Sequence, residues 1–177
     1  MGTMFIDRDQ ASGLRWRMVV AGVWCTALLL FGLYLQHAVG LVPCPMCVVQ
    51  RYALVLTAVL CAVAASLGRG AGARTTVFFA GVMGLAGAGV AARQSWLQWY
   101  PPEILACGRD LFGMIESFPL QRVIPMVFKG SGDCTTIDWT FLGLSIANWS
   151  FLNFVALGVW CLVTLWAARR RVASTVF

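Results

Sequence analysis

Residues 44–67 read CPMCVVQRYALVLTAVLCAVAASL, and this stretch decides how the rest of the chain is interpreted. It opens with two cysteines in a C-x-x-C arrangement and contains one charged residue, Arg51. A helix that crosses the hydrocarbon core of a bilayer needs about 20 mainly apolar residues. The stretch therefore predicts a transmembrane helix over about residues 48–67, with a pair of cysteines at its mouth.

The composition of the whole chain is that of a membrane protein. Of its 177 residues, 60% are hydrophobic and 11% are charged. A soluble domain has about 25% charged residues, so this chain has too few polar side chains to cover a globule in water. The net charge is +6, but the charges lie at the ends of apolar stretches, as in membrane topology. We therefore predict a lipid bilayer as the surroundings and no nucleic-acid partner.

The rest of the chain holds more apolar stretches of this kind. Three of them carry no charged side chain, over residues 18–35, 75–92 and 149–168. The segment Gly68–Arg74 is rich in glycine and is long enough only for a tight turn between the second and third spans. One face of the third span carries small residues four positions apart, which let membrane helices approach closely: Ala80, Gly84, Ala88 and Ala92. The sequence predicts an all-α membrane protein, a four-helix transmembrane bundle that forms one domain over residues 1–177.

Basic residues are distributed unequally between the two ends of the predicted bundle. Eight lie at one end: Arg8, Arg15, Arg17, Arg69, Arg74, Arg169, Arg170 and Arg171. The other end has five acidic residues and five basic ones. Its basic residues are Arg51, Arg93, Arg109, Arg122 and Lys129. Because loops on the cytoplasmic side carry the excess of basic residues, we expect both termini in the cytoplasm. Two extracytoplasmic loops follow, over about 36–47 and 93–148.

The seven cysteines divide between the bilayer and the outer face. Cys25, Cys61 and Cys161 lie within predicted helices, where a free cysteine acts as a small, inert hydrophobe. The other four fall at the outer face: Cys44, Cys47, Cys107 and Cys134. In bacteria this face is oxidising and permits disulfides.

The four outer cysteines allow three interpretations. A Cys107–Cys134 bridge would close a long loop and suit a structural disulfide, whereas a Cys44–Cys47 bridge closes a short loop and stabilises less. The second interpretation is a metal site formed by all four cysteines. Structural zinc sites often combine two short spacings, however, and only one pair here is close in sequence. We predict no metal. The third interpretation is redox exchange.

Several features of the first cysteine pair favour redox exchange. C-x-x-C is a spacing at which the pKa of a thiol is readily lowered. Cys47 lies near the start of the second predicted helix, where the helix dipole favours a thiolate. Arg51 follows four residues later, on the same helical face, and its charge would favour a thiolate or hold an oxyanion of a bound acceptor. Taken alone, Arg51 is also consistent with a side chain that extends to the lipid head groups.

Five motifs carry a resemblance to a known family: PCPMCVVQR at 43–51, LQWYP at 97–101, AC at 106–107, GSGDC at 130–134 and WTFLG at 139–143. With them the chain resembles the disulfide bond formation protein B (DsbB) family, whose members are quinone reductases of the bacterial inner membrane. The resemblance covers nearly the whole chain, from the first span to the last.

The resemblance implies a path for electrons. Cys107–Cys134 would be the disulfide attacked by a periplasmic DsbA-like protein of thioredoxin fold, with Cys107 forming the mixed disulfide. Cys134 would then exchange with Cys44. This would free Cys47 to pass electrons to ubiquinone or menaquinone, which Arg51 would contact. The resemblance also implies a multi-pass protein of the inner membrane, with redox-active loops in the periplasm, that supports disulfide bond formation.

The chain departs from some relatives at one position near the implied quinone site. Where those relatives have a histidine after the third span, this chain has Gln94. A glutamine side chain donates and accepts hydrogen bonds but does not titrate. We therefore expect Gln94 to contact the quinone without transferring protons. The one histidine of the chain, His37, ends the first span, and a structural role is expected for it.

Three rival functions remain open on the sequence. A vitamin K epoxide reductase-like protein is also a helical bundle with C-x-x-C, but there the motif is expected late in the bundle. A non-catalytic membrane scaffold with disulfide-bonded outer loops would have thiols that do not react with quinone. A metal-binding membrane protein would retain metal after mild reduction.

Overall fold

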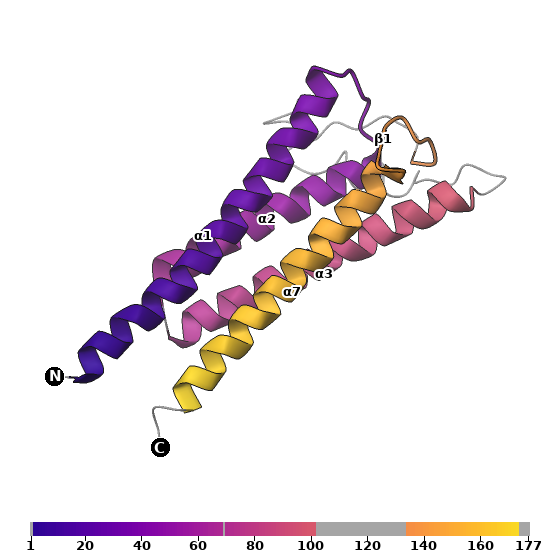
Figure 1. The fold of residues 1–177 in the computed structure, drawn as a ribbon. Helices are drawn as coiled ribbons and strands as arrows, with labels where there is room; N and C mark the ends of the chain where they lie inside the picture. Colours follow the sequence, from indigo (N-terminus) through magenta and orange to yellow (C-terminus); the bar gives the residue numbers. More distant parts are fainter. Residues whose placement is uncertain (1, 69, 102–133, 174–177) are drawn as a thin grey trace.

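The computed structural model describes residues 2–68, 70–101 and 134–173, and the side chains of 13–68, 70–101 and 134–169 within them. Its main elements are four long helices (Figure 1): α1 (Gly2–His37), α2 (Pro45–Leu67), α3 (Ala71–Trp99) and α7 (Ile146–Ala173). A short antiparallel hairpin, β1 (Thr140–Phe141) and β2 (Leu144–Ser145), leads directly into α7.

The four helices agree with the four predicted spans. Within the described residues, four segments are long and apolar enough to cross a membrane: Gly13–His37, Pro45–Leu67, Ala71–Trp99 and Ile146–Arg169. Each contains one predicted span, so the predicted all-α fold with four transmembrane helices is confirmed. The third helix, α3, continues beyond the predicted span, past Arg93 to Trp99. Gln94 and Gln98 make hydrogen bonds inside the protein at this end, which explains why the helix continues through these polar residues. The orientation in the membrane stays a prediction.

Local chemistry sets where α2 begins and how it turns into α3. Cys44 is the N-cap of α2, its sulfur accepts a hydrogen bond from the backbone N–H of Cys47, and Pro45 occupies the first turn, where a missing N–H is tolerated. The helix ends at Gly68, whose φ of 69° suits glycine and whose N–H donates to the Ala64 carbonyl at 3.2 Å. A tight turn to α3 follows.

Small residues allow the helices to pack closely. The interior is formed mainly by small and medium-sized side chains from all four helices, among them Ala21, Cys61, Ala64, Val77, Ala80, Ala88, Leu157 and Cys161. A Cβ atom added at Gly84 would lie 3.4 Å from the backbone nitrogen of Gly158, so α3 and α7 approach almost backbone to backbone there. Of the predicted small-residue face, Ala80, Gly84 and Ala88 are buried and Ala92 is exposed.

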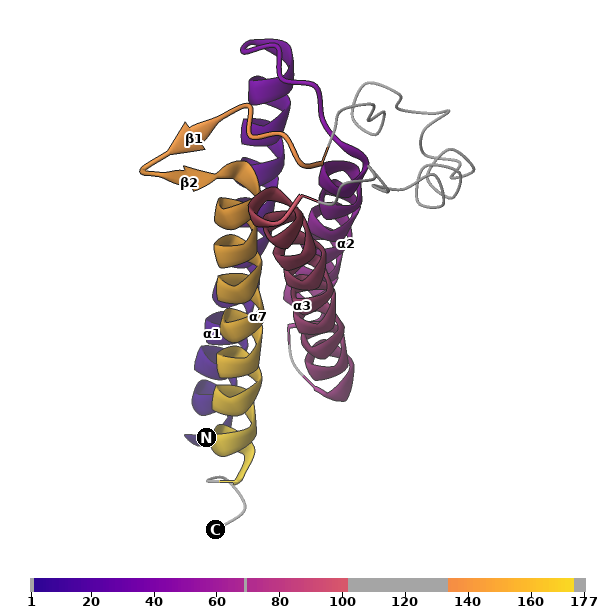
Figure 2. The ribbon, with the colours of Figure 1, turned by 90° about the vertical axis from the view of Figure 1, so that its right-hand side faces the viewer.

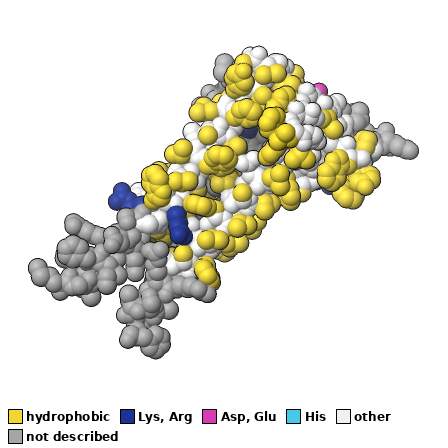
Figure 3. Space-filling view, in the orientation of Figure 1, with side chains coloured by type: hydrophobic (Ala, Val, Ile, Leu, Met, Phe, Trp, Pro, Cys, Tyr) yellow, Lys and Arg dark blue, Asp and Glu magenta, His cyan; other side chains and the backbone are white. Residues whose placement is uncertain are grey.

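The outer surface of the bundle is apolar, as a protein in lipid requires. Figure 3 shows hydrophobic side chains spread along the helices, with basic side chains near the end of the bundle where the termini lie. Trp16, Val23, Leu30 and Phe78 are among the large apolar side chains that are more than half exposed. The hairpin and the first turn of α2 lie together at the opposite end (Figures 1 and 2). That end holds the cysteine pair.

Candidate functional site

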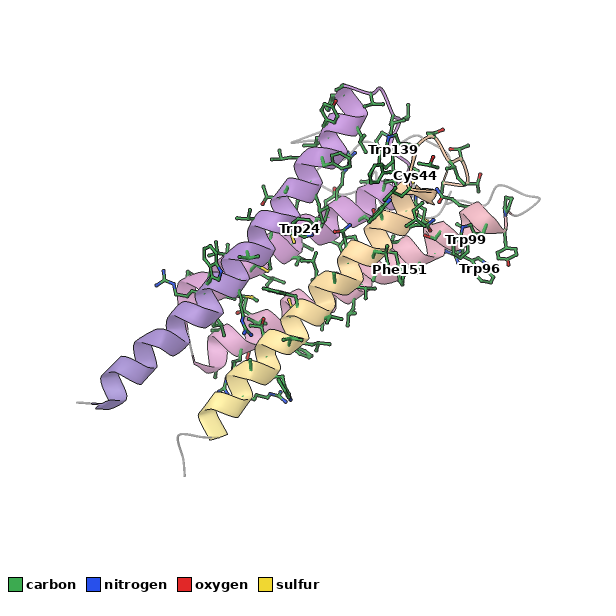
Figure 4. All side chains as sticks on the ribbon, viewed as in Figure 1. Trp24, Cys44, Trp96, Trp99, Trp139 and Phe151 are labelled. Carbon is green, nitrogen blue, oxygen red and sulfur yellow. The ribbon has the colours of Figure 1, made fainter. Side chains whose placement is uncertain are left out.

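The two sulfurs of the C-x-x-C motif lie at the first turn of α2, inside the hairpin end of the bundle. Cys44 is buried and Cys47 is half-buried, and their Sγ atoms are 3.0 Å apart. Figure 4 shows Cys44 and Trp139, which immediately precedes the hairpin, at the same end of the bundle, and both line one cavity. The pair is thus enclosed by protein and lies beside the membrane-spanning segments.

Cys134, from the far end of the long loop, joins this pair. It is fully buried and packs in one cluster with Cys44 and Met46. Hydrogen bonding with Cys134 raises the pKa of the Cys44 thiol above its usual range, and hydrogen bonding with Cys47 and burial raise it further. Of the four predicted cysteines, the structure brings these three together, and Cys107 lies outside the described residues.

A pair of glutamines holds the two sulfurs from the side of α3. The Nε2 atom of Gln94 donates to Sγ of Cys44 and to Sγ of Cys47, at 3.3 Å in each case. Its Oε1 atom accepts a hydrogen bond from Nε2 of Gln50 at 2.7 Å. Both glutamines are buried. Because Gln50 binds the amide oxygen, the amide nitrogen of Gln94 is directed at the sulfurs.

Gln94 was predicted from the sequence as a site residue, whereas Gln50 was not. One signal was available, since Gln50 lies three residues after Cys47 and therefore on the same helical face. A polar amide on an otherwise apolar span also needs a buried partner. Nothing in the sequence indicated that its partner is Gln94, because that contact depends on how α2 and α3 are packed.

Arg51 lies one turn further along α2. Its side chain is only 8% exposed, and Nη1 donates to Oε1 of Gln36 at 2.7 Å. Its positive charge acts on the sulfur of Cys47. A buried cation is costly unless it has partners, so this guanidinium is held at the site by the sulfurs and by α1. His37, in contrast, is exposed at the end of α1 and does not line the site.

A cavity of about 440 Å³ opens beside the cysteines. Its polar end is formed by Cys47, Arg51, Gln36 and Gln94, and its walls are largely apolar side chains of α1 and α7. Four aromatic rings with successive centroids about 6 Å apart follow one side of it: Phe31, Trp139, Phe141 and Trp149. Further along, Nε1 of Trp24 on α1 donates to Oδ1 of Asn153 on α7 at 3.1 Å. The cavity could hold a flat, lipophilic molecule with polar oxygens at one end.

Among the described residues, no group of three or more histidine, cysteine, aspartate or glutamate side chains is arranged to hold a metal ion. The reactive groups that the structure brings together here are the sulfurs of Cys44, Cys47 and Cys134. A buried pair of thiols, a third cysteine in contact and a fixed cation beside an apolar cavity suit thiol–disulfide exchange next to a lipophilic acceptor.

Comparison with known proteins gives a consistent result. The model of the family "Disulfide bond formation protein DsbB" matches residues 14–164. A Disulfide bond formation protein B of Polaromonas sp. (strain JS666) is 62% identical over 152 residues, which cover 84% of this chain and 88% of the relative. One of Acidovorax sp. (strain JS42) is 57% identical over 152 residues, covering 86% and 87%. The predicted resemblance is confirmed, and the match includes the C-x-x-C helix, the glutamine pair and Cys134. This chain belongs to the DsbB family of disulfide bond formation proteins.

Proposed function

We propose that this protein is a dithiol:quinone oxidoreductase of the bacterial inner membrane. It would reoxidise a periplasmic DsbA-like dithiol protein and pass the electrons to ubiquinone or menaquinone, and so support disulfide bond formation. The observation that carries the proposal is the contact of Cys134 with Cys44, beside a cavity in which Cys47 and Arg51 lie at the polar end. Membership of the DsbB family supports it further.

The cysteines would act in two exchange steps. The partner thiolate attacks Cys107 of the Cys107–Cys134 disulfide, a mixed disulfide forms, and Cys134 leaves as a thiolate. Cys134 then attacks Cys44 of the Cys44–Cys47 disulfide, a Cys44–Cys134 bond forms, and Cys47 leaves as a thiolate. Each step forms one disulfide and breaks one. The partner's second thiolate would then release the oxidised partner from Cys107, and Cys107 would attack Cys134 and re-form their disulfide. The dithiol left at Cys44 and Cys47 would hold the two electrons for the quinone. The contact of Cys134 with Cys44 supports the second step.

The residues around Cys47 suit a leaving thiolate. The amide nitrogen of Gln94 donates to its sulfur at 3.3 Å, and the charge of Arg51 acts on the same atom. Cys47 also lies in the first turn of α2, where the helix dipole stabilises negative charge. The charge would therefore collect on Cys47, at the edge of the cavity.

The residues that line the cavity fit a quinone. Arg51 offers hydrogen-bond donors at the polar end, and the apolar walls suit a lipophilic ring and tail. A quinone bound there would supply an acceptor for two electrons and two protons. Arg51 would orient its oxygens, and the aromatic side chains would exclude water from the sulfurs. Gln94, whose amide N–H groups are directed at the two sulfurs, would lie beside the quinone without transferring protons.

The proposal is tested by assaying the purified wild-type protein with a reduced DsbA-like protein and ubiquinone. We expect continuous oxidation of the partner with one quinone reduced per dithiol. Cys61→Ala is the matched control, because Cys61 is fully buried on α2 within the bundle core, and it should retain turnover. An absence of turnover with both ubiquinone and menaquinone would contradict the proposal and favour outer cysteines that only cross-link loops.

The size of the cavity offers a second test, at Gly87. A Cβ atom added there would overlap three ring carbons of Phe154, which lines the cavity. Gly87→Ala should therefore push the ring into the cavity, raise the KM for quinone severalfold, and cost about 1–3 kcal/mol of stability through overpacking. The KM for the partner should not change. Steady-state kinetics with each substrate varied in turn measures both constants.

Gly89→Ala is the control for this variant. Gly89 lies on the same helix, and a Cβ atom added there would meet nothing within 4 Å. Its quinone kinetics should equal those of the wild type. If Gly87→Ala also leaves the KM for quinone unchanged while its melting temperature falls, the cavity beside Phe154 is not where quinone binds.

A further inference from the structure

Gln98 makes two hydrogen bonds that connect three separate parts of the chain. It lies on α3, one turn beyond Gln94. Its Oε1 atom accepts a hydrogen bond from Oγ of Ser145 at 2.6 Å, and its Nε2 atom donates to the carbonyl oxygen of Thr136 at 3.3 Å. Ser145 ends the hairpin just before α7, and Thr136 lies two residues after Cys134. Gln98 thus joins α3 to the start of α7 and to the segment that carries Cys134.

The direction of these hydrogen bonds is fixed by their surroundings. Ser145 is buried, and its Oγ atom accepts a hydrogen bond from the backbone N–H of Asn148 at 3.4 Å, in the manner of a helix N-cap. Its own proton is then free to go to Gln98. A flipped amide would place Oε1 of Gln98 against the Thr136 carbonyl, where two acceptors would face each other. The amide nitrogen must therefore point to Thr136.

Exchange between Cys134 and Cys44 requires their sulfurs to meet, and small displacements of reacting groups slow such steps strongly. Cys134 is fully buried against Cys44. Its burial holds the side chain there, and a hydrogen bond to the backbone near it reduces the freedom of the segment further. The hydrogen bond from Gln98 ties the backbone two residues away from Cys134 to the last turn of α3.

We propose that Gln98 is a positioning residue that holds Cys134 against Cys44 and thereby sets the rate at which electrons pass between the two cysteine pairs. The inference rests on the proposed function and adds to it a residue whose hydrogen bonds reach Ser145 and Thr136 and no sulfur. Because Gln98 also lines the cavity, its effect is measured at saturating quinone. Gln98 would act on the exchange between cysteine pairs and not on the reaction of Cys44–Cys47 with quinone.

The experiment isolates the exchange step with a partner variant that keeps only its attacking cysteine. This thiolate attacks Cys107, Cys134 is released, and the Cys44–Cys134 disulfide forms while Cys47 appears as a thiol. The mixed disulfide cannot be resolved by the partner, so the state persists. Acid quenching and alkylation with a mass-tagged maleimide then give the rate at which Cys47 is freed.

Two substitutions separate the two hydrogen bonds of Gln98. Gln98→Leu removes both, whereas Gln98→Glu keeps the acceptor for Ser145 and loses the donor to Thr136. Both variants should free Cys47 about five- to tenfold more slowly, as expected for one lost hydrogen bond. The maximal rate of quinone reduction driven by dithiothreitol, which reduces Cys44–Cys47 directly, should stay within about twofold of the wild type at saturating quinone. A loss that is only structural would lower both rates.

Thr76→Val is the matched control, because it removes a side-chain hydrogen bond, from Oγ1 of Thr76 to the carbonyl of Gly72, at the opposite end of α3, and it should exchange at the wild-type rate. If Gln98→Glu frees Cys47 as fast as the wild type does, the positioning role of Gln98 is wrong while the proposed function stands. If the wild type itself never forms the Cys44–Cys134 disulfide, the proposed function fails, and the role of Gln98 fails with it.

Discussion

Replacing Cys47 with serine should abolish catalytic turnover, with a fall in the rate of quinone reduction of at least about a thousandfold. A hydroxyl group forms no disulfide, so Cys44 would have no bridge for Cys134 to attack. The Cys107–Cys134 disulfide could still oxidise one partner molecule. We therefore expect at most one oxidised partner per Cys47→Ser chain and no reduced quinone, as measured by thiol titration together with the absorbance of the quinone.

The number of partner molecules oxidised per chain distinguishes the loss of the Cys47 thiol from a loss of folding. An unfolded variant would not give one oxidised partner per chain and would lose its melting transition. Cys47→Ser should keep the folded bundle, because the side chain differs by one atom at a half-buried position. Cys161→Ala changes a fully buried cysteine of α7 and should turn over continuously. Sustained quinone reduction by Cys47→Ser would show that electrons leave through another residue, and the proposed order of the cysteines would be wrong.

The four helices could be predicted from the sequence because the bilayer imposes a simple rule. A span needs a long apolar stretch, and the stretches around Cys25, Cys61, Gly84 and Cys161 are separated by charged or glycine-rich segments. The end of α3 was harder to place. Residues 93–99 contain polar side chains, and only the hydrogen bonds of Gln94 and Gln98 inside the protein explain why the helix continues through them.

Parts of the site that lie on one helix could also be predicted. Cys44, Cys47 and Arg51 follow one another along the start of α2, so their spacing alone places them on one side. Contacts between distant segments could not be predicted in this way. The bond between Gln50 and Gln94 depends on the packing of α2 against α3. The contact of Cys134 with Cys44 was implied by family resemblance, and no spacing rule would have given it.

Replacing Arg51 with alanine should raise the KM for quinone by roughly 10- to 100-fold, since a hydrogen bond from a charged donor is worth about 1.5–3 kcal/mol. The guanidinium is buried at the polar end of the cavity, where water would not replace it efficiently. The KM for the partner protein should not change, because we propose that the partner reacts at Cys107 and not at the cavity. Arg51→Lys keeps the charge without the planar fork and should fall between Arg51→Ala and the wild type.

Binding can be measured apart from turnover, because Trp139 and Trp149 line the same cavity and a bound quinone should quench their fluorescence. Titration of Arg51→Ala should give a weaker Kd by the same factor as the KM. Arg93→Ala removes an exposed arginine at the same end of the bundle, so it controls for a general change in charge and should bind quinone normally. If Arg51→Ala and Arg93→Ala weaken binding equally, the effect comes from surface charge and not from a contact in the cavity. If only Arg51→Ala weakens it, the buried cation serves the acceptor, which explains why α2 keeps a charged residue inside its transmembrane span.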